Sequence, residues 1–227
     1  YLIGVKSFYY LYYQSGLSKH FLQKGITMNV FSGIDKELVA ITNYNFAKND
    51  RAHRIEHITD VAVNSVRIAE ALNLDKELMV VAALCHDMCC HIDRATHHSL
   101  GSDWVTENLG KYRSMEGSYY NEEQVKLVAE MVYHHRASSK TVVYPNLHCE
   151  AFAAADRGIL EIVAMVKRVS FTDPAEIIHH LVDKFHPETG YAKLNSVHQK
   201  IFAKENEEFG IAIKELTIEK VIAILNS

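Results

Sequence analysis

An unbroken apolar run near the middle of the chain ends in an adjacent histidine and aspartate. Residues 78 to 85 read LMVVAALC, and His86 and Asp87 follow at once. A helix with apolar residues on every side is buried nearly all round, so the pair would lie at a buried helix end. A carboxylate there is costly unless a cation or several hydrogen bonds compensate its charge, and an imidazole beside it completes an N/O pair suited to a divalent metal. The pair is therefore either part of a metal site or a core histidine with a capping aspartate.

The remaining pattern favours an all-α fold. The chain contains only three prolines and ten glycines in 227 residues, and no stretch of any length shows the alternation of a half-buried strand. With 48% hydrophobic residues, a chain of this length can bury one sizeable core. We therefore predict a single helical domain over residues 28–227.

The first 27 residues are predicted to be an extension of uncertain status. They begin YLIGVKSFYYLYY, which lacks both the long apolar core of a membrane span and the small-residue cleavage site of a secretory signal. We expect the native chain to start at Met28.

Charge and cysteine usage restrict the partners and the setting. The formal net charge of -4 provides no basic field to hold a nucleic-acid backbone, so polymeric nucleic acid is not an expected partner. The four cysteines lack the spacing of a disulfide framework, which indicates a reducing, cytoplasmic setting. No membrane partner is expected. Assembly into a homo-oligomer stays open.

The unusual feature of the composition is its 14 histidines. His53 and His57 are four residues apart at the start of a helix predicted to begin after Asp50, so their rings stack on one side of it. His57 borders the apolar stripe of that helix.

Two further pairs of adjacent histidines flank predicted helices. His97 and His98 lead into one helix, while His134 and His135 end another, for which Asn121 is the predicted cap. Each of these histidines could also be an ordinary surface or hydrogen-bonded residue.

An aspartate lies in the apolar stripe of a later helix, predicted to run from about Asn146 through Val163. Asp156 falls four residues after Phe152 and three before Ile159, in phase with both. A carboxylate in such a stripe requires a partner, and a metal is the partner that best fits the histidines elsewhere.

The chain is predicted to close on three helices. Asp173 and Pro174 form a cap and first-turn pair for the first of them. The other two are expected over about Asn195–Phe209 and Ile211–Leu225.

The order of these residues resembles that of the HD-domain superfamily of metal-dependent phosphohydrolases. In that family a helical His, an adjacent His and Asp that end a central helix, and a distant Asp on a later helix bind a divalent metal. The matching residues are His57, His86 with Asp87, and Asp156. HITDVAVNSVRIAEAL looks like the family's first ligand helix, AALCHD like its second and AAADRGIL like its last. The resemblance covers about residues 50–163 and implies an HD-domain helical bundle.

The resemblance also implies roles for other histidines. Small bacterial and archaeal members have a histidine four before the first ligand, matched by His53, and a histidine before an arginine on a later helix, matched by His135 with Arg136. Members with two metals use additional histidines between the central pair and the last aspartate, a role that His97 fits best, with His98 as the runner-up. The candidates for a second metal are His97, His98, His134 and His135.

One position departs from the family pattern. Many members place Lys, Arg or Glu three residues after the central Asp, where it contacts phosphate or acts as general acid, and here that residue is Cys90. A cysteine is a poor substitute, so proton donation must come from elsewhere or be weak. The available replacements are His91, Asp93, Arg94 and His97.

The expected reaction is hydrolysis of a small phosphorylated substrate, a nucleotide. A divalent metal (Mn, Mg, Fe, Co, Ni or Zn) would activate water and neutralise charge at phosphorus, with Asp87 as a ligand that also orients the water. The residues expected to bind phosphate or to protonate the leaving group are His53, His97, His135 and Arg136.

Two other hypotheses stay open. One is a di-iron HD-type oxygenase, which iron content with oxygen uptake would favour over phosphate release. The other is a non-catalytic metal- or nucleotide-binding regulatory module, which the cysteine at position 90 keeps open.

Overall fold

The computed structural model describes residues 30–136, 143–158, 162–169, 171–185 and 195–227. The chain divides into two compact units, Tyr1–Ser32 and Gly33–Ser227, and nearly all of the described residues belong to the second. The predicted extension, its expected boundary at Met28, and Ile159 lie outside the described residues.

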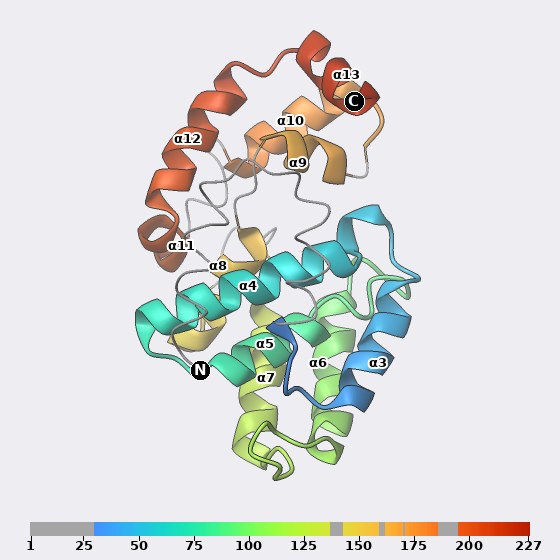
Figure 1. Ribbon diagram of the computed structural model, residues 1–227, viewed down its shortest axis with the longest axis vertical. Coiled ribbons are helices and arrows are strands. Elements are labelled where there is room, and N and C mark those ends of the chain that lie inside the picture. Colours follow the sequence, from blue (N-terminus) through green and yellow to red (C-terminus); the bar gives the residue numbers. More distant parts are fainter. Residues whose placement is uncertain (1–29, 137–142, 159–161, 170, 186–194) are drawn as a thin grey trace. The chain divides into compact units, whose positions relative to one another are not determined.

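The described part of the chain is all-helical, as predicted, and contains no strand (Figure 1). It has eleven α-helices, labelled α3 to α13, and two short 3-10 helices. The α-helices are α3 Lys36–Phe46, α4 Ile55–Leu72, α5 Lys76–Cys85, α6 His97–Asn108, α7 Glu122–His134, α8 Leu147–Arg157, α9 Ile162–Arg168, α10 Pro174–Phe185, α11 Ser196–Ile201, α12 Ala203–Lys214 and α13 Ile218–Asn226. The 3-10 helices are Arg51–His53 and Leu109–Lys111.

Helix α5 is buried on every side. Asp75 caps its first turn by accepting a hydrogen bond from the backbone N–H of Leu78 at 3.0 Å. From Leu78 to Cys85 no residue is more than 4% exposed. Helices α4, α7 and α8 pack against α5 and bury its apolar residues on different sides. The burial predicted from the apolar run is confirmed.

Helices α4 and α8 are joined near the end of α8. The amide of Asn64 on α4 donates to the carbonyl oxygen of Ala155 at 3.2 Å. A Cβ at Gly158 would lie 2.0 Å from that amide nitrogen, so glycine leaves room for the contact. Helix α8 ends at Arg157, and the predicted continuation through Val163 is wrong, because Val163 belongs to the separate helix α9.

The C-terminal helices form a smaller core of their own. Helices α9, α10, α12 and α13 bury a shared apolar cluster that consists of Met165, Val166, Ile177, Leu181, Phe185, Phe209, Ile213, Leu216 and Val221. Asp173 and Pro174 begin α10 as predicted, with Asp173 accepting from the backbone N–H of Ala175 at 2.7 Å.

The prediction of two closing helices after α10 is wrong. The structure has three, because the chain leaves the helical conformation at the buried Phe202, between α11 and α12. A second break separates α12 from α13, where the Thr217 hydroxyl accepts from the backbone N–H of Lys220 and starts the last helix.

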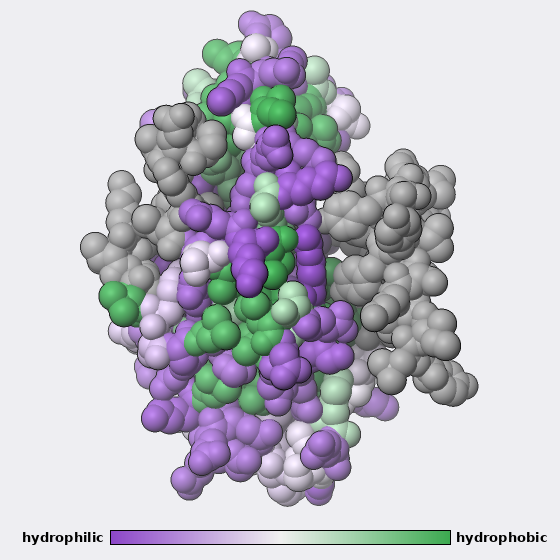
Figure 2. Space-filling model, turned by 90° about the vertical axis from the view of Figure 1, so that its left-hand side faces the viewer, coloured by the Kyte–Doolittle hydropathy of each residue, from purple (hydrophilic) through white to green (hydrophobic). Residues whose placement is uncertain are grey.

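The surface of the described helices mixes polar and apolar side chains. On the face drawn in Figure 2, hydrophilic residues enclose the apolar patches. Within the described ranges, no helix combines the length and the apolar character needed to cross a membrane.

Helix α6 comes close to the end of α5 at Gly101. A Cβ at this position would lie 3.4 Å from the carbonyl oxygens of Cys85 and His86, and 3.0 Å from Cγ1 of Val132 on α7. The missing side chain therefore lets α6, which begins at His97, approach the segment that carries His86.

The substitution Gly101→Val is expected to destabilise the protein by about 1–3 kcal/mol, because the added methyl groups overpack this contact. Chemical denaturation would measure the change in the free energy of unfolding. Ser102→Val is the matched control, since Ser102 lies on the same helix but lines a groove. An equal loss in both variants would contradict the packing explanation and point to the helix propensity of valine instead.

Candidate metal centre

Two histidines and two aspartates from three helices meet at one point. His57 lies on α4, His86 and Asp87 follow the last residue of α5, and Asp156 lies in the last turn of α8. Nε2 of His57 is 3.3 Å from Oδ2 of Asp87 and 3.1 Å from Oδ1 of Asp156. Nε2 of His86 is 3.1 Å and 3.6 Å from the same two oxygens. The structure thus brings together all four residues predicted to hold the first metal.

The two carboxylates of this group are held charged in a buried place. His57, His86 and Asp87 are at most 4% exposed, and the Asp156 side chain is 17% exposed. Burial by itself would raise the carboxyl pKa, but the facing histidines hold the pKa of Asp87 and of Asp156 well below the usual range. Burial would likewise lower the pKa of His86, yet the two carboxylates raise it to about 10. The carboxylates need positive charge beside them, which imidazole protons or a divalent ion can supply.

Backbone contacts orient three imidazoles toward Asp87. His86, His97 and His135 each place Nδ1 near the carbonyl oxygen three residues earlier, at 2.9, 2.8 and 2.5 Å respectively. If Nδ1–H donates to this oxygen, each ring presents Nε2 to the site. Histidines that bind metals commonly donate their other ring N–H in this way, which fixes the ring and raises its basicity.

A second group of side chains meets at the other oxygen of Asp87. Oδ1 lies 3.3 Å from Nε2 of His97 and 3.5 Å from Nε2 of His135, and these two nitrogens are 3.1 Å apart. Both histidines are buried. Asp87 therefore offers Oδ2 to the first group and Oδ1 to the second.

The donor set of both groups fits a divalent metal. Within the described ranges, His57, His86 and Asp87 offer ligand atoms that all lie within 4.8 Å of one another, and so do Asp87, His97 and His135. Imidazole nitrogens and carboxylate oxygens together suit first-row divalent ions. Lone pairs and negative charge placed so close repel one another unless a cation or a proton is shared between them.

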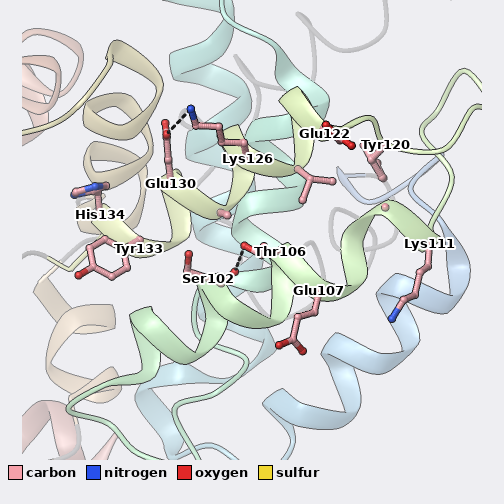
Figure 3. A pocket seen from close by; sticks show the side chains of 13 residues that line it. Ser102, Thr106, Glu107, Lys111, Tyr120, Glu122, Lys126, Glu130, Tyr133 and His134 are labelled. Atoms are coloured by element: carbon pink, nitrogen blue, oxygen red, sulfur yellow. Dashed lines mark hydrogen bonds and ion pairs between the residues drawn. The ribbon is translucent and has the colours of Figure 1, made fainter.

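The other member of each histidine pair lies outside both groups. His98 packs against the ring of Tyr133, with 5.5 Å between ring centroids. Burial, together with the nearby His135 and His97, lowers the pKa of His98 to about 4. His134 instead lines a groove of about 690 Å³ between α6 and α7 (Figure 3). For the predicted second-metal candidates, the structure therefore favours His97 and His135 and places His98 and His134 elsewhere.

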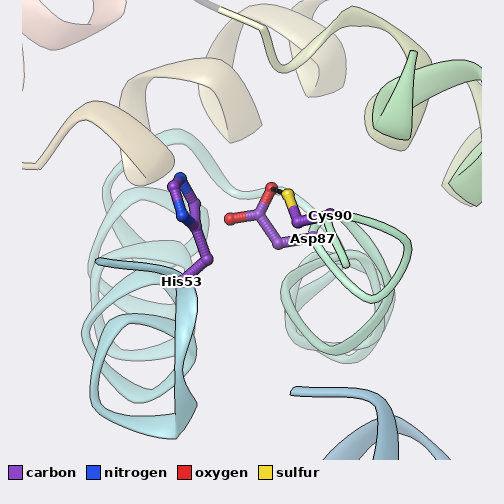
Figure 4. A group of neighbouring side chains, drawn as sticks. All are labelled: His53, Asp87 and Cys90. Carbon is purple, nitrogen blue, oxygen red and sulfur yellow. Dashed lines mark hydrogen bonds between the residues drawn. The ribbon is translucent and has the colours of Figure 1, made fainter. Parts of the chain in front are cut away.

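His53 and Cys90 flank Asp87 (Figure 4). The Cys90 thiol donates to Oδ1 of Asp87 at 3.4 Å, and burial together with the Asp87 charge raises its pKa. Without a metal beside it, Cys90 therefore stays a thiol, which is a poor acid. His53 has Nδ1 2.7 Å from a carboxylate oxygen of Asp50, and its ring faces the Asp87 carboxylate. His53 therefore lies beside the two groups without belonging to either of them.

Three charged residues predicted to serve phosphate binding or proton transfer are held by other contacts. Arg94 pairs with Asp50 at 2.9 Å, and Arg136 donates to the carbonyl oxygen of Ala95 at 2.5 Å. Asp93 accepts two hydrogen bonds from the loop that follows it. In the described structure these contacts lie outside the two ligand groups.

Arg168 on α9 reaches the first group, which the sequence analysis did not foresee. Its guanidinium donates to Nδ1 of His57 and lies 3.8 Å from a carboxylate oxygen of Asp60. Because a guanidinium cannot accept, the ring proton of a neutral His57 is then on Nε2, facing Asp156. Binding of a metal at that Nε2 requires the contact with Arg168 to open. The sequence gives only a weak indication of this contact, because Arg168 is simply one of two basic residues that follow the apolar segment IVAMV.

Comparison with known proteins identifies a family for most of this helical region. A model of the HD domain matches residues 54–188. A solved structure that matches is a predicted HD superfamily hydrolase from an uncultured Thermotogales bacterium, with 20% sequence identity and a TM-score of 0.49. The match covers 80% of this chain and 92% of that chain. The sequence has no match among curated proteins.

Metal uptake at neutral pH is expected to release protons, because the carboxylates raise the pKa of His86 to about 10 and a ligating His86 must lose its Nε2 proton. Metal affinity should therefore increase with pH up to about that value. The folding stability of the metal-free protein should instead decrease as pH rises. The raised pKa of His86 in the folded state gives stability that is present below the unfolded pKa of about 6.5 and is lost as pH rises toward 10.

Calorimetric titration with Mn²⁺ in buffers of different ionisation enthalpy would count the released protons. His86→Gln is the control variant, since it removes the proton in question. Uptake by the native chain without proton release at pH 7 would contradict the protonated state of His86.

Proposed function

This chain belongs to the HD domain family, and on that premise we propose that it is a divalent-metal-dependent phosphohydrolase that cleaves a phosphate ester of a nucleotide. The observation that carries the proposal is the position of Asp87, whose two oxygens each face a separate group of buried imidazoles. The expected partner is thus a small phosphorylated molecule rather than a nucleic-acid polymer.

The ligand sets divide between two ions in this proposal. His57, His86, Asp87 and Asp156 would hold one ion, and Asp87, His97 and His135 would hold the other. A divalent metal in such a site supplies a Lewis acid for the phosphate oxygens and lowers the pKa of bound water. Two-metal centres commonly bind both the attacking and the leaving oxygen of a phosphoryl transfer.

Residues around the ligands have separate tasks. In this proposal His53 would give a proton to the leaving oxygen, a role supported by its ring, which faces the centre while Asp50 holds its Nδ1. Once its contact with His57 opens, the Arg168 guanidinium would neutralise negative charge on the phosphate. The raised pKa of the Cys90 thiol makes it a poor proton donor, so it is assigned no chemical step.

The proposal is tested by incubating the purified full chain with nucleoside mono-, di- and triphosphates and cyclic dinucleotides in the presence of Mn, Mg, Fe, Co, Ni or Zn. Release of phosphate or of a nucleotide product, lost on chelation, is the expected result. Iron content with oxygen uptake and no hydrolysis would instead identify an oxygenase. Metal binding without turnover would identify a regulatory module.

Asp87→Ala is expected to abolish binding of both ions and all turnover, because this carboxylate belongs to both ligand groups. The helical content should change little, since apolar burial supplies most of the folding energy. Elemental analysis, circular dichroism and the phosphate-release assay measure the three effects. Asp103→Ala, at an exposed position on α6, is the control. A full metal complement in Asp87→Ala would contradict the assignment.

His135→Ala is expected to reduce the bound metal from two ions to one and to lower turnover by about 10²- to 10⁴-fold. The adjacent His134→Ala should change neither quantity by much, because that side chain lines the groove between α6 and α7. Metal content per chain and phosphate-release kinetics distinguish the two. Equal behaviour of the two variants would exclude His135 as a ligand.

A further inference from the structure

The residue after Asp156 is a buried arginine, Arg157. Arg157 is 2% exposed at the end of α8. Its Nη2 donates to the hydroxyl of Tyr144 at 3.2 Å, but its Nε and Nη1 are buried without a hydrogen-bond partner. No carboxylate among the described residues forms an ion pair with it. Burying a guanidinium without a partner costs folding free energy, and an anion that binds there would offset this cost.

A buried histidine near this arginine has one ring nitrogen without a described hydrogen-bond partner. His198 on α11 is 0% exposed, and its Nε2 has no hydrogen-bond partner in the described structure. Its Nδ1 lies 3.4 Å from the amide nitrogen of Asn206, which can donate to it. The ring proton of a neutral His198 is then on Nε2, where it is a donor without an acceptor.

A short chain of contacts ties the two residues together. The Tyr144 hydroxyl that accepts from Arg157 also lies 3.5 Å from the amide nitrogen of Asn195. Asn195 in turn accepts from the backbone N–H of His198 at 2.8 Å and caps α11. Arg157 and His198 are therefore linked through Tyr144 and Asn195. Burial first, and then the charges of Arg157 and Lys184, lower the pKa of His198 to about 3.

A lysine links this place to the metal centre. Lys184 on α10 forms no ion pair with any described carboxylate, yet it interacts electrostatically with Asp156 and Asp87 as well as with Arg157. Burial first, with Arg168 and Arg157 adding to it, lowers the pKa of the ammonium to about 8. The charge of Lys184 thus acts on both the metal centre and Arg157, and it also contributes to lowering the pKa of His198.

We propose that Arg157 and His198, aided by the charge of Lys184, form an anion-binding site next to Asp156, which holds a second phosphate group of the substrate, one that is not hydrolysed. Two unpaired guanidinium N–H groups, an ammonium and an imidazole N–H match the several acceptor oxygens of a phosphate. The assignment of this phosphate to the substrate rests on the proposed function. It predicts a preference for nucleotides that carry at least two phosphate groups.

The test uses the full-length protein, titrated calorimetrically with inorganic phosphate as purified and again after chelation of its metal. Phosphate should still bind the chelated protein, and Arg157→Met and Lys184→Met should each weaken that binding about tenfold or more, the loss of one charge-assisted contact. Lys204→Met is the control, because Lys204 is exposed and pairs with Glu208 at 3.5 Å. Loss of all phosphate binding on chelation, or equal binding in all variants, would overturn the site.

Thermal unfolding separates ligand binding from a structural role for Arg157. If the arginine is kept for an anion, Arg157→Met in phosphate-free buffer should have an unchanged or higher Tm, because it removes an unpaired buried charge. The increase in Tm that phosphate gives to the native chain should be lost. A lower Tm in Arg157→Met, with the phosphate response intact in Lys184→Met, would overturn the proposal.

Kinetics distinguish this inference from the proposed function. Lys184→Met should increase KM for a nucleoside diphosphate more than for a monophosphate, with kcat little changed. An equal effect on both substrates would overturn the substrate assignment. If no nucleotide is hydrolysed while the chelated protein still binds phosphate through Arg157 and Lys184, the proposed function fails and the anion site stands.

Discussion

The negative charge of Asp87 is the constraint on which the site depends. This carboxylate is 3% exposed, and an isolated charge at such depth would be prohibitively unfavourable. Four imidazoles face it, His57 and His86 on one oxygen and His97 and His135 on the other. The same arrangement that stabilises the carboxylate gathers the nitrogen ligands of a metal centre, so folding and metal binding draw on one set of interactions.

Packing of the apolar helices determines how these side chains meet. Helix α5 is covered on different sides by α4, α7 and α8, which places its C-terminal end inside the protein rather than at the surface. Small groups then allow close approach. Gly101 admits α6 to the carbonyl end of α5, and Gly158 leaves room for the Asn64 amide that joins α4 to α8. These contacts set the positions of His97 and Asp156 within the centre.

Adjacent residues of opposite charge give the end of α8 two roles. Successive residues of a helix point in directions about 100° apart, so Asp156 and Arg157 face different neighbours. Asp156 joins the ligand group, while Arg157 turns toward Tyr144 and α11. The Lys184 ammonium interacts electrostatically with both Asp156 and Arg157. A substrate bridging the two places would meet metal ligands at one end and unpaired donors at the other.

The sequence by itself determined the helical class, the burial of α5, and the four residues expected to hold the first metal. The first two predictions depend on local periodicity. The ligand residues depend on the resemblance of the residue order to that of the HD-domain superfamily, and both are properties of the linear sequence. The resemblance already favoured His97 over His98 and matched His135. Only tertiary structure, however, shows which histidine of each adjacent pair faces the centre, because neighbours on a helix differ in direction and packing determines which one points inward. The same holds for Arg168. Its contact with His57 arises from a helix far along the chain, and the spacing of residues in the sequence carries no record of it.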